Sequence, residues 1–247
     1  MCGRFVLNQT AAEIEAVFGV MDHDGGIAPR FNSAPTQPVL MIAKGHPRAP
    51  GSNLPDRRAL LVRWGLLPSW VKDVKGFPLL FNARSETAGE KATFRAALRH
   101  HRTLVPASGF YEWKRTGKDG ARPFFIRPRR GGVIAFAGLM ETFLDPNGSE
   151  MDTGAILTTG ANETLAPIHH RMPVVIHEED FARWLDCVRN EPRDVADLMR
   201  PAEPDFFEAI PVSDRVNKVA NDDAALLDPA PDAPEPAAPK TDQLSLF

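Results

Sequence analysis

The chain consists mostly of short apolar or alternating stretches of strand length, with a few longer stretches of helical periodicity. The strand-like stretches are bounded by Gly, Pro, Asn and Asp, which are typical of turns. Gly117–Gly120 separates two of these stretches in the manner of a hairpin. The predicted strands cover residues 3–7, 60–64, 110–115, 123–127, 133–139, 155–159 and 173–176.

Helices are predicted from their start signals and from the spacing of apolar residues. Thr10 and Glu13 form a capping box, and Gly19 ends that helix. Thr87 and Glu90 form a second capping box, which predicts a helix running to about residue 102. Two further helices are expected to begin near residues 178 and 192.

The predicted strands outnumber the helices and do not alternate with them regularly. This order indicates an α+β fold with an antiparallel, barrel-like β core and peripheral helices. We expect a single domain over residues 1–221. Residues 222–247 are rich in Ala, Pro and Asp, and we expect them to be disordered because they cannot bury enough apolar surface to fold.

Composition narrows the class of protein. Hydrophobic residues make up 43% and charged residues 25% of the 247-residue chain, which is typical of globular domains. No apolar run is long enough to span a membrane. The two cysteines, Cys2 and Cys187, do not form a disulfide framework, and no spacing suggests a metal site. We expect a monomeric cytoplasmic protein with no metal and no cofactor.

The formal net charge of −3 hides an uneven distribution. Residues 222–247 hold six acidic residues and one basic residue, so residues 1–221 carry a formal charge of +2. A mildly basic body permits phosphate binding without demanding it.

Cys2 is the first candidate for chemistry. Removal of Met1 would leave Cys2 with a free α-amine and a thiol on one Cα. The amine can form a Schiff base with an aldehyde, and the thiol can close onto the imine carbon to give a thiazolidine. Ring closure is intramolecular and is therefore fast, and an α-amine titrates near ~7.7–8.0, so part of it is nucleophilic at neutral pH.

Two segments combine polar residues on one face of an extended chain. Arg4 lies two residues from Cys2, and Asn82 lies two residues from Arg84, so each pair shares a face. An Asn side chain can orient a nucleophile, and an Arg can bind a phosphate through two hydrogen bonds. Surface ion pairs are the alternative role for both arginines.

Two further segments offer groups for proton transfer. Glu112 lies in a predicted strand with aromatic neighbours, where a carboxylate is available for general acid–base work. The alternative is a solvent-facing strand residue. His169, His170 and Arg171 precede another predicted strand. Because the two histidines are adjacent, we expect them to point apart, with at most one serving a site.

These segments together resemble the SOS response-associated peptidase (SRAP) family of abasic-site processing proteins. The resemblance covers about residues 1–221 in family order. The matching segments are Met1–Phe5, Arg30–Thr36, Arg63–Pro68, Asn82–Glu86, Gly109–Lys114, His169–Pro173 and Val212–Asn217.

The resemblance implies a self-sacrificing enzyme that binds single-stranded DNA and crosslinks to the ring-opened aldehyde of an abasic site. It implies that Cys2 attacks, Asn82 orients Cys2, and Glu112 moves protons. His169 would assist ring opening, crosslink reversal and strand-cleaving lyase chemistry. The residues implied to lie at the DNA are Arg4, Arg84, Arg171 and Thr158.

Trp64 and Trp70 flank an apolar segment that, by the same resemblance, wedges against a duplex end and stacks on bases. Base–aromatic stacking contributes ~1–3 kcal/mol per base. Core packing is the alternative role for Trp64.

The last five residues resemble the peptide that binds the bacterial sliding clamp. Gln243 offers hydrogen bonds, and Leu244, Leu246 and Phe247 are apolar anchors at the end of a solvated tether. The tail would bring the domain to replication forks, where it would raise the local concentration of the enzyme. The alternative is a terminus that packs back onto the domain.

Two other functions remain open at this stage. Cys2 could be the N-terminal nucleophile of a cysteine peptidase, with its own amine as base and Asn82 or backbone amides as oxyanion donors. The chain could also be a non-enzymatic DNA-binding adaptor recruited by the clamp, which would bind reversibly and with strong salt dependence.

Overall fold

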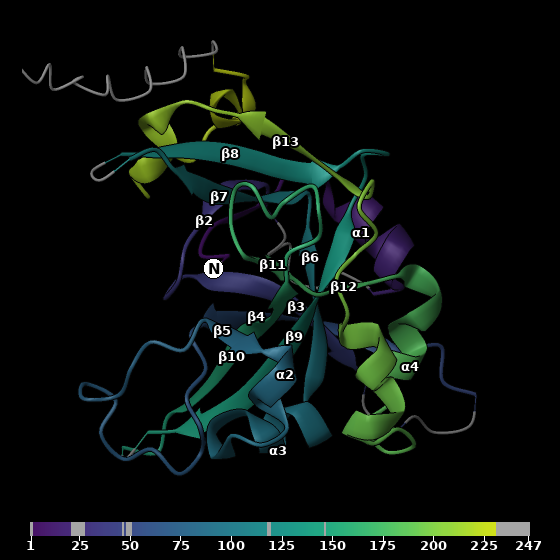
Figure 1. Cartoon of the computed structure of the whole chain (residues 1–247). Helices are drawn as coiled ribbons and strands as arrows, with labels where there is room; N and C mark the ends of the chain where they lie inside the picture. Colours follow the sequence, from purple (N-terminus) through teal and green to yellow (C-terminus); the bar gives the residue numbers. More distant parts are fainter. Residues whose placement is uncertain are drawn as a thin grey trace, which may run out of the picture.

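The centre of the molecule is a five-stranded closed barrel. The computed structural model describes residues 2–20, 28–45, 47, 51–117, 120–145 and 147–230. In barrel order the strands are β10 (Glu150–Gly160), β4 (Arg57–Trp64), β3 (Pro38–Lys44), β6 (Arg102–Ala107) and β9 (Ile134–Leu144). Pairing of β9 with β10 closes the ring (Figure 1). All pairings are antiparallel except that of β4 with β10, which is parallel.

The parallel pairing of β4 with β10 requires a glycine at position 154. Trp64 of β4 is in register with Gly154 of β10, and the N–H of Gly65 donates to the Gly154 carbonyl at 2.8 Å. A Cβ on Gly154 would lie 2.5 Å from the Met41 side chain and 2.9 Å from the Leu139 carbonyl. Only a residue without a side chain fits between these strands.

Three short strands extend the barrel sheet on the side where the candidate residues gather. The strand β5 (Asn82–Arg84) runs parallel to β10, and β11 (Arg171–Pro173) runs antiparallel to it. The strand β12 (Val175–Ile176) pairs with β9. Asn82, Arg84 and Arg171 are therefore held by pairing to one strand, β10.

A second, antiparallel sheet lies across one end of the barrel. Its order is β13 (Phe207–Pro211), β8 (Ala121–Pro128), β7 (Gly109–Arg115), β1 (Phe5–Leu7) and β2 (Arg30–Ser33). One face packs on the barrel: Phe110 meets Phe136 edge-on at 5.9 Å between ring centroids. The other face is covered by the C-terminal segment, whose Val216 and Leu226 pack with Tyr111.

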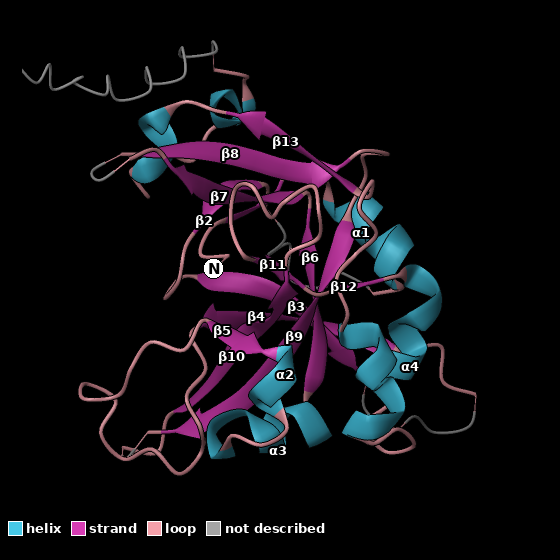
Figure 2. Ribbon diagram, in the orientation of Figure 1, coloured by secondary structure: helices cyan, strands magenta, loops and turns pink. Residues whose placement is uncertain are grey.

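The helices are short and peripheral (Figure 2). They are α1 (Ala11–Phe18), α2 (Ser85–Ala88), α3 (Ala92–His100), α4 (Phe181–Leu185) and the 3₁₀ helices η1 (Glu178–Asp180), η2 (Pro192–Met199), η3 (Asp214–Asn217) and η4 (Ala224–Leu227). With the barrel, they confirm the α+β prediction. No helix among the described residues is both long and apolar enough to cross a membrane.

One of the two predicted capping boxes is correct. Thr10 and Glu13 cap α1 reciprocally, and Gly19 ends it in the left-handed conformation. The second was wrong: Thr87 lies inside α2, and α3 starts after Lys91. The reason is that pairing of Asn82–Arg84 with β10 brings the chain straight from a strand into α2 at Ser85.

The folded part extends past the predicted boundary at residue 221. Asp222 accepts hydrogen bonds from the backbone N–H groups of Phe31 (2.5 Å) and Asn32 (2.9 Å). Leu226 is fully buried, and the N–H of Ala230 donates to the Pro211 carbonyl at 2.8 Å. The predicted disorder of residues 222–230 was therefore wrong, because these residues cover an apolar sheet face. Residues 231–247, including Gln243, Leu244, Leu246 and Phe247, lie outside the described residues.

Candidate active site

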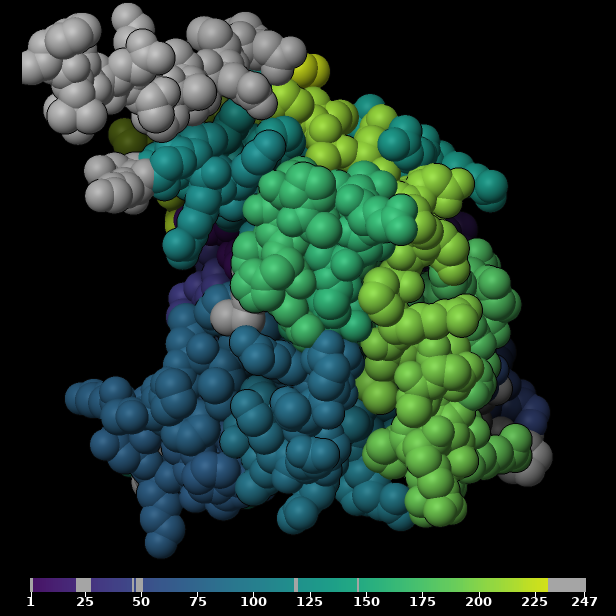
Figure 3. Space-filling view, in the orientation of Figure 1, coloured from purple at the N-terminus to yellow at the C-terminus, as the bar shows by residue number. Residues whose placement is uncertain are grey.

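Cys2 lies just before β1, in the hydrophobic core that the second sheet shares with the barrel. Its side chain is fully buried. The N–H of Tyr111 donates to the carbonyl of Arg4 at 2.9 Å, so the segment before β1 continues alongside β7. Figure 3 shows the N-terminal segment, in purple, recessed between the teal hairpin β7–β8 and the blue part of the chain. Burial, and secondarily the negative charge of Glu112, raise the pKa of the Cys2 thiol, so the thiol is protonated at neutral pH.

Glu112 and His169 form a pair beside this cysteine. Glu112 lies in the middle of β7 and is only 4% exposed, which excludes the solvent-facing alternative. Its Oε1 is 3.8 Å from Nδ1 of His169. The same Nδ1 accepts the backbone N–H of Arg171 at 3.0 Å, and this bond fixes the ring. A carboxylate and an imidazole at this separation can exchange protons with a reacting group between them.

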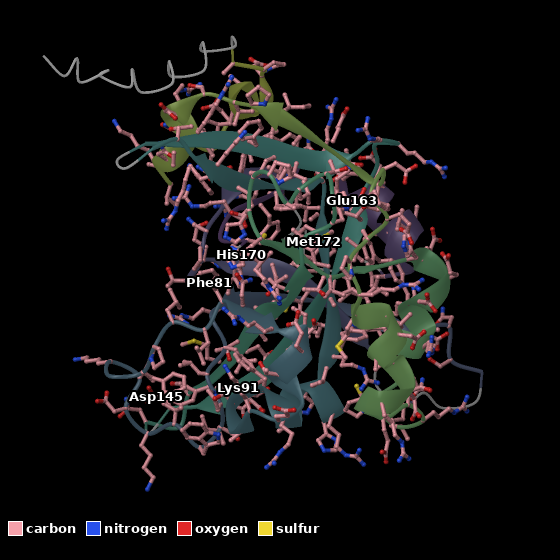
Figure 4. The ribbon with its side chains drawn as sticks, in the orientation of Figure 1. Phe81, Lys91, Asp145, Glu163, His170 and Met172 are labelled. Atoms are coloured by element: carbon pink, nitrogen blue, oxygen red, sulfur yellow. The ribbon has the colours of Figure 1, made fainter. Side chains whose placement is uncertain are left out.

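The two histidines do not point apart as predicted. Their ring centroids are 4.4 Å apart, with planes inclined at 32°. The loop before β11 holds them in this arrangement, since the Ala161 N–H donates to the His170 carbonyl. His170 is labelled with Met172 in Figure 4. The electrostatic interaction with the adjacent His169 ring is the main cause that lowers the pKa of His170, so the two rings do not readily carry positive charge together.

Asn82 carries a polar atom without a partner. Its Nδ2 donates to the Ile156 carbonyl at 3.4 Å, while its Oδ1 is buried and has no hydrogen-bond partner among the described residues. A buried acceptor without a hydrogen bond lowers the free energy of unfolding, so its presence in a folded protein calls for an explanation such as a ligand. This acceptor suits the predicted role of orienting an amine. The ring of Trp64 contacts Phe5 and Phe81 and so connects β1 with the strand of Asn82.

Arg4 has a different environment from the predicted phosphate contact. Its guanidinium donates to Asn32 Oδ1 (2.9 Å), the Val216 carbonyl (2.7 Å) and the Asn217 carbonyl (3.3 Å). Burial lowers its pKa. Arg4 therefore ties the N-terminal segment to η3, and its charge is shared among neutral acceptors.

Arg171 is likewise engaged. Its guanidinium makes a bidentate pair with Glu86 at 2.6 and 2.8 Å and donates to the Thr158 carbonyl at 2.5 Å. Arg171 lowers the pKa of Glu86 through this hydrogen bonding. Thr158 is fully buried, and its hydroxyl donates to the Ala83 carbonyl at 3.4 Å. Arg84, by contrast, is exposed, and its side chain makes no hydrogen bond or ion pair with another described residue.

The two tryptophans differ in their exposure to solvent. Trp64 is fully buried, and its Nε1 donates to the Phe81 carbonyl at 2.8 Å. The predicted stacking of Trp64 on bases was wrong, because this side chain belongs to the barrel core. Trp70 is 57% exposed and is supported edge-on by Phe77 at 5.8 Å.

Two residues of this region had no role in the sequence interpretation. Glu86 pairs with Arg171, and the fully buried Asn32 holds Arg4 and donates to the carbonyls of Val216, Lys218 and Asn221. Both stand in the segments that carry the family resemblance, and that position was the available signal. Within the described ranges, no group of three His, Cys, Asp or Glu side chains is arranged to hold a metal ion.

The chain is similar to several known proteins over most of its length. It is 37% identical over 230 residues to "Abasic site processing protein YoqW" of Bacillus subtilis, covering 92% of this chain and 99% of that one. It is 32% identical over 266 residues to "Abasic site processing protein HMCES" of Gallus gallus, covering 93% and 78%. A solved protein of Bacteroides thetaiotaomicron shares the fold, with a TM-score of 0.80 at 23% identity over 93% of this chain and 100% of that one.

A family profile described as "SOS response associated peptidase (SRAP)" matches residues 1–219. This match takes in β1 with the preceding Cys2, β7 with Glu112, and the His169–Arg171 segment. The chain therefore belongs to the SRAP family.

Proposed function

We propose that this protein captures abasic sites in single-stranded DNA by a covalent bond to Cys2. The relatives named above are abasic site processing proteins. The observation that carries the proposal is the grouping of Cys2, Glu112 and His169. The N-terminal segment runs alongside β7, since Phe5 pairs with Phe110 and the Tyr111 N–H donates to the Arg4 carbonyl, and Glu112 of β7 is 3.8 Å from the imidazole of His169.

The reaction begins after Met1 is removed. The α-amine of Cys2 attacks the aldehyde of the ring-opened sugar, and loss of water gives an imine. The thiol then adds across the C=N bond: sulfur bonds to carbon, and the thiol proton passes to nitrogen. Because the thiol is protonated at neutral pH, this step needs a base, and Glu112 is the nearby carboxylate. The unpaired Oδ1 of Asn82 accepts a hydrogen bond from the amine.

The imine stage also permits lyase chemistry. A protonated imine acidifies the adjacent C–H of the sugar, so a base can remove that proton and the 3′ phosphate can leave. Glu112 and His169 are the candidates for that base. Ring closure by the thiol competes with elimination, and we expect the crosslink to be the main product because the thiol is already on the same Cα as the amine.

The test is a denaturing gel of the protein with single-stranded DNA that carries one abasic site. Mass spectrometry first verifies that the sample begins with Cys2. We expect a heat-stable shifted band that is absent with Cys2→Ala. Cys2→Ser separates the alternatives, since serine retains an N-terminal nucleophile for peptide hydrolysis and cannot form a thiazolidine. The proposal is wrong if Cys2 is free and no band forms.

The C-terminal pentapeptide is proposed to bind a bacterial sliding clamp. The support is its sequence, with Gln243 followed by Leu244, Leu246 and Phe247 at the end of an Ala/Pro-rich tether. Deletion of residues 243–247 is expected to abolish binding to an immobilised clamp and to leave crosslinking of abasic DNA unchanged. Equal clamp binding by the shortened and full-length chains would refute the assignment.

A further inference from the structure

Asn32 lies where three distant segments of the chain meet. It belongs to β2 and is fully buried. Its Oδ1 accepts a hydrogen bond from the Arg4 guanidinium at 2.9 Å. Its Nδ2 donates to the carbonyls of Val216, Lys218 and Asn221 at 3.2, 3.1 and 2.8 Å. One side-chain amide therefore joins the N-terminal segment to the C-terminal segment.

The partners of this amide determine its orientation. A guanidinium can only donate hydrogen bonds, and a backbone carbonyl can only accept them. The three carbonyls can therefore face only Nδ2, and the guanidinium of Arg4 can face only Oδ1. The two halves of the Asn32 side chain have separate partners, so a substitution can remove one set of contacts and keep the other.

The segment that Arg4 anchors carries Cys2, two residues earlier. The Arg4 carbonyl accepts the N–H of Tyr111 at 2.9 Å. The Cys2 thiol donates to the same carbonyl, with Sγ 4.0 Å from the oxygen. Arg4 is thus held through its backbone by β7 and through its side chain by Asn32. Because only Gly3 separates Arg4 from Cys2, the position of Arg4 limits the positions that Cys2 can take.

We propose that Asn32 is a positioning residue for Cys2 and that it acts through Arg4. The inference rests on the proposed function for the reaction that Cys2 performs. The aldehyde of an abasic site is attached to a strand that the body of the protein binds, so Cys2 must lie at one place relative to that body. Misplacement of a reacting group by about 1 Å lowers a rate by up to about 10²-fold. The hydrogen bond from Arg4 to Asn32 restricts such a movement.

The first test compares two substitutions of Asn32. Asn32→Asp keeps an oxygen acceptor for Arg4 and loses the donor to the three carbonyls, whereas Asn32→Ala loses both. Because both variants leave the same carbonyls unpaired, we expect both to melt at a lower temperature than the unsubstituted protein. At saturating abasic DNA, Asn32→Ala should crosslink about 10- to 100-fold more slowly than the unsubstituted protein. Asn32→Asp should crosslink faster than Asn32→Ala.

A purely structural role of Asn32 predicts a different result, in which crosslinking rate follows melting temperature and both variants lose rate together. Asp222→Ala is the matched control, since Asp222 accepts the backbone N–H groups of Phe31 and Asn32. It should lower the melting temperature and leave the crosslinking rate unchanged, at a temperature at which every variant is folded. Equal rates for Asn32→Asp and Asn32→Ala, or a rate for Asp222→Ala as low as that of Asn32→Ala, would overturn the proposal.

A double-mutant cycle tests whether Asn32 acts through Arg4. Arg4→Met removes the guanidinium and leaves the three carbonyl contacts of Asn32 in place, so it also serves if Asn32→Ala does not fold. We expect Arg4→Met to slow crosslinking at saturating DNA and the added Asn32→Ala to slow it no further. An unchanged rate for Arg4→Met, or multiplication of the two effects, would refute the path through Arg4.

The salt dependence of binding separates positioning from phosphate contact. Binding of single-stranded DNA without an abasic site is measured by fluorescence anisotropy at several salt concentrations. Each lost phosphate contact lowers the slope of log K against log[salt] by about 0.7 on single strands. We expect Asn32→Ala to keep the slope of the unsubstituted protein. A slope lowered by this amount would make Asn32 part of a phosphate site and would overturn the proposal.

Alkylation of Cys2 distinguishes failure of this inference from failure of the proposed function. Modification by iodoacetamide is followed by mass spectrometry of the N-terminal peptide, which does not contain Cys187. Asn32→Ala should be modified faster than Asn32→Asp, because its buried thiol is held less firmly. If this order is found while no protein crosslinks abasic DNA, only the proposed function is refuted. If the unsubstituted protein crosslinks while the two variants crosslink and alkylate at equal rates, only this inference is refuted.

Discussion

Replacing the two tryptophans separately should separate fold stability from DNA binding. Trp64 is fully buried, contacts Phe5 at 5.1 Å and Phe81 at 6.0 Å between ring centroids, and donates one hydrogen bond. Trp64→Ala should therefore cost about 3–5 kcal/mol of unfolding free energy through the cavity it leaves. In a domain of this size, that corresponds to a fall in melting temperature of about 6–20 °C.

Trp70 should behave in the opposite way. It is 57% exposed and contacts Phe77, so Trp70→Ala should change stability by less than about 1 kcal/mol. If Trp70 stacks on a base, its loss should weaken binding to single-stranded DNA by ~1–3 kcal/mol, or about 5–150-fold. Thermal unfolding followed by circular dichroism and anisotropy with labelled DNA measure the two quantities on the same samples.

Trp64→Phe is a milder substitution that provides a folded variant if Trp64→Ala does not fold. It keeps an aromatic ring and loses the N–H that donates to the Phe81 carbonyl, which should lower the unfolding free energy by about 1–3 kcal/mol. We expect its DNA affinity to equal that of the unsubstituted protein. The reasoning is refuted if either Trp64 variant keeps its melting temperature and loses DNA binding, or if Trp70→Ala unfolds at a much lower temperature.

Further predictions concern three charged residues, Glu86, Asp222 and Arg102. Glu86→Gln should free the charge of Arg171 and raise affinity for single-stranded DNA by about fivefold at 0.1 M salt, and anisotropy would contradict this if affinity fell. Because the folded-state pKa of Glu86 is lowered from 4.5, its stabilising contribution is present above that pH and is lost as the pH falls through the lowered value. The melting temperature of Glu86→Gln should therefore depend less on acid pH than that of the unsubstituted protein. Asp222→Ala should cost about 1–3 kcal/mol in urea unfolding, whereas a domain ending at residue 221 would show no change. Arg102→Met should lower the unfolding free energy by at least about 1–3 kcal/mol, because this buried guanidinium donates to four backbone carbonyls, and a melting temperature equal to that of the unsubstituted protein would contradict that account.

Some local signals in the sequence predicted local structure correctly, although the capping box predicted at Thr87 was wrong. The capping box at Thr10 and the strand that carries Glu112 depend on interactions between residues a few positions apart, so a short stretch of sequence is enough to predict them. The pairings that close the barrel join strands far apart in sequence, as Arg63 of β4 joins Thr153 of β10. Alternation within a strand predicts its faces and does not identify its neighbour.

At the candidate site, too, the sequence did not identify which distant residues contact one another. Candidate residues could be proposed from the sequence, and two of them, Glu112 and His169, lie 3.8 Å apart in the structure. The partners of the arginines could not be predicted. An Arg side chain indicates an anionic or carbonyl ligand, but the carbonyl that Arg4 uses comes from Val216 and the carboxylate that Arg171 uses comes from Glu86. These contacts arise only in the tertiary structure, and they leave Arg84 as the exposed arginine of the three.

The distribution of charge bears on how this protein selects its target. Arg4 and Arg171 are engaged within the protein, and Arg84 is the exposed arginine of the three that we predicted at phosphates. One phosphate contact gives a salt slope of only about −0.7 on single strands, which is weak and reversible binding. Strong discrimination between intact and abasic DNA then cannot come from phosphate contacts, because both strands present the same backbone. Under the proposed function, this discrimination comes from the step that requires an aldehyde, at Cys2, Glu112 and His169, so selectivity would follow from bond formation.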